Sequence, residues 1–169
     1  PATAQPERIA DAIQLNEATV AFASPIVWAN TVRWCQKNKV TLISTGGSTK
    51  ITNSNCIETN VHWTYDTYAL AVGTGKAVVA NGGDTWFFIT ADYAFGHSLE
   101  GDTADVVTTS GGKVLGKVRV PFPNADFSSF LLQAQASGAK IIGLANAGSD
   151  TINTIKQAKE FGITQIQTL

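Results

Sequence analysis

The segment Thr85–Ala91 constrains the fold most, because it is a dense run of apolar, aromatic and β-branched residues. Such a run is typical of a strand buried on both faces, which occurs mainly in parallel sheets covered by helices. Asp92 ends the run, Tyr93 and Phe95 follow in the expected turn, and Gly96 would allow an unusual backbone there. Because ligands of open α/β sheets bind outside the carboxyl ends of the strands, the two rings are expected where small molecules bind.

Strand and helix patterns alternate along the whole chain with short connections, which predicts parallel sheets with helices on both faces. Gly and Pro punctuate the pattern, as in Gly82-Gly83 and at Gly138 and Gly162, both expected to close helices. The expected strands are Glu17–Ala23, Val40–Thr45, Val61–Tyr65, the segment that begins at Thr85, Lys113–Val120, Ile141–Ala145 and the start of Ile163–Leu169. The expected helices are Pro6–Gln14, Pro25 to about Asn38, Thr67–Ala80, about Gly96–Thr109, Phe127–Ser137 and Asp150–Phe161.

Composition narrows the function classes. Apolar residues make up 44% of the 169 residues and charged residues 15%, and the net charge of −1 gives no basic surface for nucleic acid or an anionic membrane. No apolar run has the length of a membrane span, and the first residues lack the basic and apolar blocks of a signal peptide. The chain contains no Met and begins with Pro1, so we expect a processed form or a segment of a longer protein.

The two cysteines, Cys35 and Cys56, are separated by 20 intervening residues and form no CxxC motif. With only two distant histidines they make no zinc set, so no metal site is expected. Two interpretations of the pair stay open: a disulfide, if the protein is exported, or two free thiols packed in the fold.

Two short motifs come close to catalytic or nucleotide-binding signatures without matching them. Gly73-Thr74-Gly75-Lys76 lacks both the first glycine and the hydroxyl residue of a P-loop, and it lies in a helical pattern. Gly96-His97-Ser98-Leu99-Glu100 lacks the last glycine of a nucleophile elbow, and its serine falls after the turn. His62 is the only other histidine that could serve Ser98 as a base. We therefore expect no catalytic residues and no cofactor.

Two other segments have both a structural and a functional interpretation. The loop Ser44–Thr49 follows a strand and carries no charge, so its N–H groups and hydroxyls either bind a carboxylate or simply form a turn with Ser48 or Thr49 as a helix cap. The aromatic segment His62–Tyr68 either packs Trp63 and Tyr65 into the fold or uses one of them to line a pocket.

The chain resembles the periplasmic solute-binding proteins of ABC importers, in the branched-chain amino-acid (Leu/Ile/Val) cluster, close to the subgroup that takes up aromatic acids and small carboxylates. The resemblance is strongest over about Val40 to Ile163. It rests on the runs ISTGGST, VHWTYDTYALAVGTGKAVV and WFFITADYAFGHSLEGDT, and on DFSSFLLQAQASGAK at Asp126–Lys140, which is specific to that cluster.

The resemblance implies a type I periplasmic-binding-protein fold of two Rossmann-like α/β lobes joined by a hinge, with a ligand bound in the cleft between them. The implied parts are residues 1–60 of the first lobe, a hinge crossing with the first helix of the second lobe over 61–84, and the second lobe over 85–169. Family chains are considerably longer, so both lobes are expected to be incomplete over these residues.

The resemblance also implies ligand-binding positions. The loop Gly46–Ser48 would offer main-chain N–H groups and a hydroxyl to a ligand carboxylate. Phe95, just before Gly96, stands where amino-acid binders commonly carry Tyr, which suggests a less polar ligand. Pro25 and Ile26 depart from the small hydroxyl residues that usually follow the position of Ser24. With Trp63 and Tyr93 as further apolar walls, the expected ligand residues are Ser24, Gly46, Gly47, Ser48, Trp63, Tyr93, Phe95, Asn146 and Ala147.

The expected function is therefore to bind a small organic acid or amino acid in the periplasm and deliver it to a membrane permease of an ABC importer, without catalysis and without nucleic acid. Two alternatives remain: a flavodoxin-like or Rossmann-like enzyme domain with its own cofactor, and a ligand-sensing receptor domain of the same fold.

Overall fold

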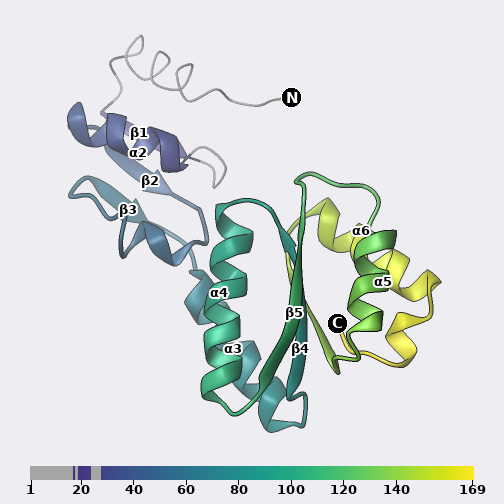
Figure 1. The fold of residues 1–169 in the computed structure, drawn as a ribbon. Coiled ribbons are helices and arrows are strands. Elements are labelled where there is room, and N and C mark those ends of the chain that lie inside the picture. Colours follow the sequence, from purple (N-terminus) through teal and green to yellow (C-terminus); the bar gives the residue numbers. More distant parts are fainter. Residues whose placement is uncertain (1–16, 18, 24–27) are drawn as a thin grey trace. The chain divides into compact units, whose positions relative to one another are not determined.

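The structure is a computed structural model that describes residues 17, 19–23 and 28–169 (Figure 1). The chain divides into two units, Pro1–Asp66 and Thr67–Leu169, and each is described by itself. The helix expected at Pro6–Gln14 and the candidate ligand residue Ser24 lie outside the described residues. Among the residues described, no helix has the length and apolar character needed to cross a membrane.

Unit 1 contains a parallel three-stranded sheet in the order β1-β2-β3. Its elements are β1 Val20–Ala23, α2 Trp28–Lys37, β2 Thr41–Ser44, the 3₁₀ helix η1 Thr49–Ile51, and β3 Asn60–His62. Each strand is shorter than the sequence predicts. A small core of Val32, Cys35, Leu42 and Ile51 joins α2 and η1 to the central strand.

Unit 2 has three layers, with α3 and α4 on one face of a parallel sheet and α5 and α6 on the other (Figure 1). The strand order is β5-β4-β6, so the buried run of the sequence forms the central strand, as predicted. Its elements are α3 Thr67–Ala80, β4 Thr85–Ala91, α4 Ala94–Thr109, β5 Lys113–Val120, α5 Ser128–Ala136, β6 Ile141–Ala145, α6 Ser149–Glu160 and η2 Ile163–Gln165.

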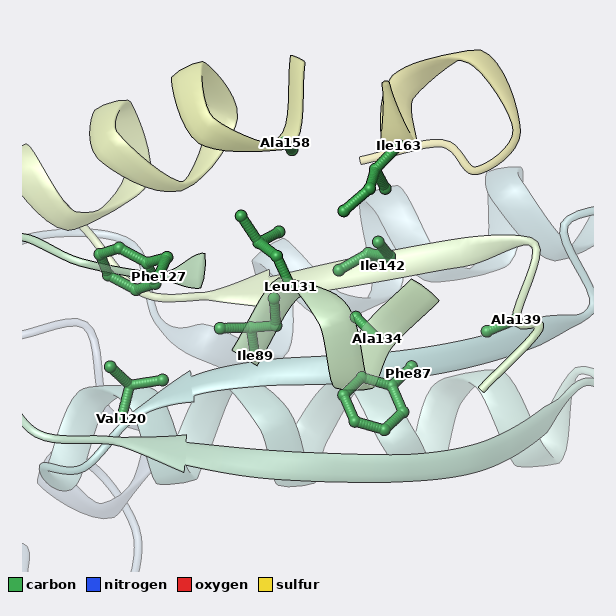
Figure 2. Close-up of a cluster of buried hydrophobic side chains, with 10 residues drawn as sticks. All are labelled: Phe87, Ile89, Val120, Phe127, Leu131, Ala134, Ala139, Ile142, Ala158 and Ile163. Atoms are coloured by element: carbon green, nitrogen blue, oxygen red, sulfur yellow. The ribbon is translucent and has the colours of Figure 1, made fainter. Parts of the chain in front are cut away.

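The side chains of β4 alternate between two separate cores. Trp86 and Phe88 pack toward α3 and α4, where Val107 and Ile141 complete the cluster. The residues of the opposite face pack toward α5 and α6 in a second cluster, whose side chains come together in Figure 2: Phe87, Ile89, Val120, Phe127, Leu131, Ala134, Ala139, Ile142, Ala158 and Ile163. Burial on both faces explains why this strand lacks the polar alternation of a half-exposed strand.

The prediction of a strand that begins within Ile163–Leu169 is wrong for most of this segment. Gly162, with φ of +70°, turns the chain after α6, and η2 follows. Ile163 is fully buried, and the Gln167 amide donates to the carbonyl oxygens of Ala134 and Ala139. Only Thr168 forms a parallel bridge, with Ile141 of β6. This segment is therefore held by the burial of one isoleucine and by side-chain hydrogen bonds to α5 and the turn after it. It does not form the hydrogen-bond ladder of a strand.

Candidate functional site

The loop after β2 is held in place by its own side chains. The Gly46 N–H donates to Ser44 Oγ at 3.3 Å, and Ser48 Oγ accepts from the Lys50 N–H at 3.3 Å as the N-cap of η1. The cap predicted for Ser48 is therefore present, and the Gly46 N–H already has a partner. Gly46, Gly47 and Ser48 are all buried.

Gly47 is the member of this loop that remains able to bind a ligand through its main chain. Within the part of the chain that the structure describes, its buried N–H has no hydrogen-bond partner. A buried backbone N–H without a partner costs free energy unless a ligand or water satisfies it. A carboxylate oxygen suits this position, because carboxylates form strong hydrogen bonds with backbone N–H groups.

His62 fixes the same loop from β3, a contact that sequence reasoning missed. Its Nε2 lies 2.6 Å from the Gly46 carbonyl oxygen, and because a carbonyl only accepts, Nε2 carries the proton. Ser98 itself is buried inside α4, well past the turn where a nucleophile elbow places its serine. The near-miss hydrolase motif therefore has no support in these contacts.

Trp63 follows β3, and its backbone N–H donates to the Ser44 carbonyl oxygen at 3.0 Å. Its side chain is 74% exposed, so it does not pack into the core of unit 1. A Trp side chain left this exposed is uncommon, because indole burial contributes strongly to folding. Its role as a ligand wall remains a prediction.

The end of β4 carries the aromatic candidate residues of unit 2. Tyr93 is the N-cap of α4 in an extended conformation, and Phe95 lies in the first helical turn. Gly96 lies within α4 and has a helical backbone, so the unusual backbone suggested by the sequence is absent at this residue. Glycine is needed here because a side chain would not fit. A Cβ on Gly96 would lie 2.1 Å from the Ala91 carbonyl oxygen and 2.9 Å from that of Ala145. Only glycine lets the first turn of α4 approach the ends of β4 and β6 this closely.

A row of three half-buried rings follows from this arrangement. The Tyr93 and Phe95 ring centroids are 6.1 Å apart, and Tyr93 stacks on Phe122 at 4.5 Å with an interplanar angle of 28°. Phe122 comes from the loop after β5, which reaches β4 because the Asp92 N–H donates to the Val120 carbonyl oxygen at 2.8 Å. Sequence analysis missed Phe122, although an aromatic residue just after a predicted strand is the same signal that singled out Phe95.

The loop after β6 contributes Asn146 and Ala147 at the same edge of the sheet. The Asn146 Oδ1 accepts from Thr151 Oγ1 at 2.8 Å, and its Nδ2 donates to Thr154 Oγ1 at 3.2 Å. The side chain is buried and attached to α6. Ala147 is half-buried and follows it directly. The proposed ligand roles of both residues remain predictions.

A buried carboxylate fixes α4 against the sheet. Glu100 accepts from Thr90 Oγ1 at 2.7 Å through one oxygen, and from Lys117 Nζ at 2.8 Å and Arg119 Nη2 at 3.1 Å through the other. The Glu100 side chain is only 5% exposed, so the two cations on β5 offset the cost of burying its charge. These bonds hold the helix whose first turn carries Phe95.

The remaining polar and apolar features do not point to a cofactor. Gly73-Thr74-Gly75-Lys76 lies inside α3, so it forms no phosphate-binding loop, and a Cβ on Gly75 would come within 3.0 Å of Val106 of α4. Among the described residues, no cluster of His, Cys, Asp or Glu could hold a metal ion. Cys35 is buried and Cys56 exposed, both as free thiols, and burial raises the pKa of Cys35.

An apolar hollow of about 400 Å³ lies in unit 2, beside β6. Residues of α3, β4, α4, β6 and α6 line it together with Thr168 and Leu169, and none of the predicted ligand residues borders it. It offers no charged group that could orient a ligand, so the candidate site stays at the carboxyl ends of the strands.

Solved structures with the same fold come from several bacteria. A periplasmic binding protein from Burkholderia mallei is 49% identical with a TM-score of 0.92, and covers 98% of this chain. A branched-chain amino-acid ABC transporter periplasmic ligand-binding protein from Burkholderia xenovorans is 26% identical, with a TM-score of 0.77 over 98% of the chain. A solute-binding protein from Rhodopseudomonas palustris, in complex with 4-hydroxybenzoate, is 20% identical with a TM-score of 0.87 over 99%.

The chain spans 46% of the length of each of these three proteins. No curated protein matches the sequence. The type I periplasmic-binding fold predicted from the sequence is confirmed by these structures and by the parallel sheets of both units. A model of the periplasmic binding protein family matches residues 11–169, and the chain therefore belongs to that family.

Proposed function

We propose that this chain is part of a solute-binding protein of an ABC importer, which binds a small organic carboxylate and delivers it to a membrane permease. The periplasm is the proposed compartment. The role needs no chemical step and no cofactor.

The observation that carries the proposal is the N–H of the buried residue Gly47, which has no partner among the described residues and lies in a loop fixed by Ser44, Ser48 and His62. A fixed backbone donor binds an anion without first paying to order the loop. No cationic side chain is needed at this position, because a carboxylate is well satisfied by neutral donors.

The row of rings at the end of β4 supports a ligand that has an apolar body. Phe95 lacks the hydroxyl that Tyr would bring, so the row favours a ring or branched chain over a polar group. Binding sites are commonly apolar walls with a few placed polar donors. The complexes of Rhodopseudomonas palustris solute-binding proteins with benzoate and 4-hydroxybenzoate agree with this choice.

A thermal-shift screen of the whole protein tests the proposal. The panel contains benzoate, 4-hydroxybenzoate, leucine, isoleucine and valine. A ligand that binds only the folded state at a hundred times its Kd adds about 2.7 kcal/mol to the free energy of unfolding, which is readily seen as a higher Tm. Stabilisation by none of the panel would contradict the proposed function.

A further inference from the structure

The loop between β5 and α5 carries a ring that the sequence did not single out, and its position is set by a second helix. We propose that Phe122 is a specificity-determining residue that contacts the aromatic ring of the ligand, and that Asp150 and Gln157 of α6 are its positioning residues. This inference rests on the proposed function and narrows the ligand to an aromatic carboxylate.

The first step is the stacking of Phe122 on Tyr93. A centroid separation of 4.5 Å with nearly parallel rings is an offset-stacked geometry, and such pairs contribute beyond their buried area. Because Tyr93 also approaches Phe95, the ring row continues from the end of β4 to the end of β5. A flat ligand ring has a matching surface there, whereas a branched aliphatic chain covers less of it.

The second step is the attachment of the Phe122 loop to α6. Both carboxylate oxygens of Asp150 lie 3.3 Å from the Asn124 backbone N–H, which donates to them. Asp150 is fully buried in the first turn of α6, where the positive end of the helix dipole favours its charge. Burying a carboxylate costs free energy, and among the described residues Asp150 has no ion-pair partner, so its contact with this loop has a structural purpose.

Gln157 makes a second attachment two turns further along the same helix. Its Oε1 accepts from the Phe127 N–H at 2.7 Å, and its Nε2 donates to the Ala125 carbonyl oxygen at 2.8 Å. Phe127 is itself 1% exposed in the α5–α6 core. The loop is therefore fixed at three backbone positions just after Phe122, which reduces the entropy lost when a ligand orders the ring.

The test compares Phe122→Ala with Phe161→Ala in the whole protein by calorimetric titration of benzoate, 4-hydroxybenzoate and leucine. Phe161 is an exposed ring that caps the C-terminal end of α6. Because α6 begins just after the carboxyl end of β6, its C-terminal end lies away from the strand ends that carry the ring row, and Phe161 is therefore a matched control. We expect Phe122→Ala to weaken benzoate binding about tenfold. The benzoate affinity of Phe122→Leu, which keeps an apolar side chain, should lie between those of the wild type and Phe122→Ala. Phe161→Ala should bind benzoate as tightly as the wild type does.

A fluorine NMR measurement gives a second readout that loss of stability would not mimic. With 4-fluorophenylalanine incorporated, the Phe122 resonance, assigned by its absence in Phe122→Leu, should shift when benzoate is added, and the Phe161 resonance should not. In ligand-free Gln157→Leu, which removes both attachments to the loop, the Phe122 resonance should also move. Gln157→Glu keeps the acceptor for the Phe127 N–H and should shift the Phe122 resonance less than Gln157→Leu does.

Each result has a distinct meaning. Benzoate binding that is equal in Phe122→Ala and Phe161→Ala, with an unmoved Phe122 resonance, overturns this inference and leaves the proposed function standing. Binding of leucine, but of neither benzoate nor 4-hydroxybenzoate, also overturns this inference and leaves the proposed function standing. Binding of none of the three ligands overturns both. An unchanged Phe122 resonance in Gln157→Leu overturns the positioning role.

Discussion

Gly96→Ala tests the close approach that places Phe95 at the sheet edge. The new Cβ would lie 2.1 Å from the Ala91 carbonyl oxygen and 2.9 Å from the Ala145 carbonyl oxygen. A carbon and a carbonyl oxygen normally stay about 3.3 Å apart or more, so the first turn of α4 must move by roughly 1 Å. Both obstacles are backbone atoms at strand ends, and neither can rotate away as a side chain would.

The size of the effect follows from two opposing terms. Overpacking typically costs about 1–3 kcal/mol, and a clash with two backbone carbonyls belongs at or above the upper end. Alanine recovers about 1 kcal/mol of helix propensity relative to glycine. We therefore expect Gly96→Ala to lower the free energy of unfolding by about 2–3 kcal/mol. The displaced turn carries Phe95, so ligand affinity should fall as well.

Gly101→Ala in the same helix is the matched control, because no atom lies within 4 Å of its Cβ position. It should leave the protein unchanged or stabilise it by up to about 1 kcal/mol. Urea unfolding followed by circular dichroism measures both variants, with an unchanged slope showing that the same surface unfolds. If Gly96→Ala were as stable as Gly101→Ala, the close contact described above would be refuted.

Three further predictions concern polar contacts. Glu100→Ala leaves Arg119 without its buried partner and should destabilise unit 2 by about 2 kcal/mol in urea unfolding, while Glu100→Gln should lose less. Hydrogen bonds from the Ser128 hydroxyl and backbone N–H lower the pKa of Asp126, so their contribution to stability is present above about pH 4 and is lost as the pH falls through the lowered pKa. Ser128→Ala should raise that pKa in an NMR titration. His62→Ala removes the bond to the loop after β2 and should weaken carboxylate binding several-fold in calorimetry.

Each of these predictions has a result that contradicts it. A Glu100→Ala variant as stable as the wild type would mean that the two β5 cations contribute nothing through this carboxylate. An unmoved carboxyl titration in Ser128→Ala would remove the hydroxyl as the main cause of the shift. Equal ligand affinity in wild type and His62→Ala would show that the loop holds its shape without that bond.

Local sequence patterns predicted the elements of unit 2 closely. The bounds of Thr67–Ala80, Lys113–Val120 and Ile141–Ala145 agree with the structure, because apolar periodicity and flanking glycines mark them within the segment itself. Gly111 and Gly138, both with positive φ, stand where the patterns break. Elements whose stability depends on their own residues are visible in this way.

Features that depend on distant residues were not predictable from such patterns. The segment Ile163–Leu169 looked like a strand, and only the bonds from Gln167 to Ala134 and Ala139 explain its actual course. The requirement for glycine at position 96 comes partly from the Ala145 carbonyl oxygen, 49 residues later in the chain numbering. Local propensity carries no information about such contacts.

The candidate site divides in the same way. The loop after β2 and Phe95 were singled out from the residues together with the family resemblance. The partner of His62 and the stacking of Phe122 depend on strand order and loop attachment, which only the fold defines. The sequence therefore indicated which strand ends to consider, but not which side chains meet there.

The most direct test is a crystal structure of the whole protein with 4-hydroxybenzoate. The proposed function predicts a carboxylate oxygen of the ligand about 3 Å from the Gly47 nitrogen. A ligand whose carboxylate is held elsewhere, with the Gly47 N–H bonded to the protein itself, would contradict it.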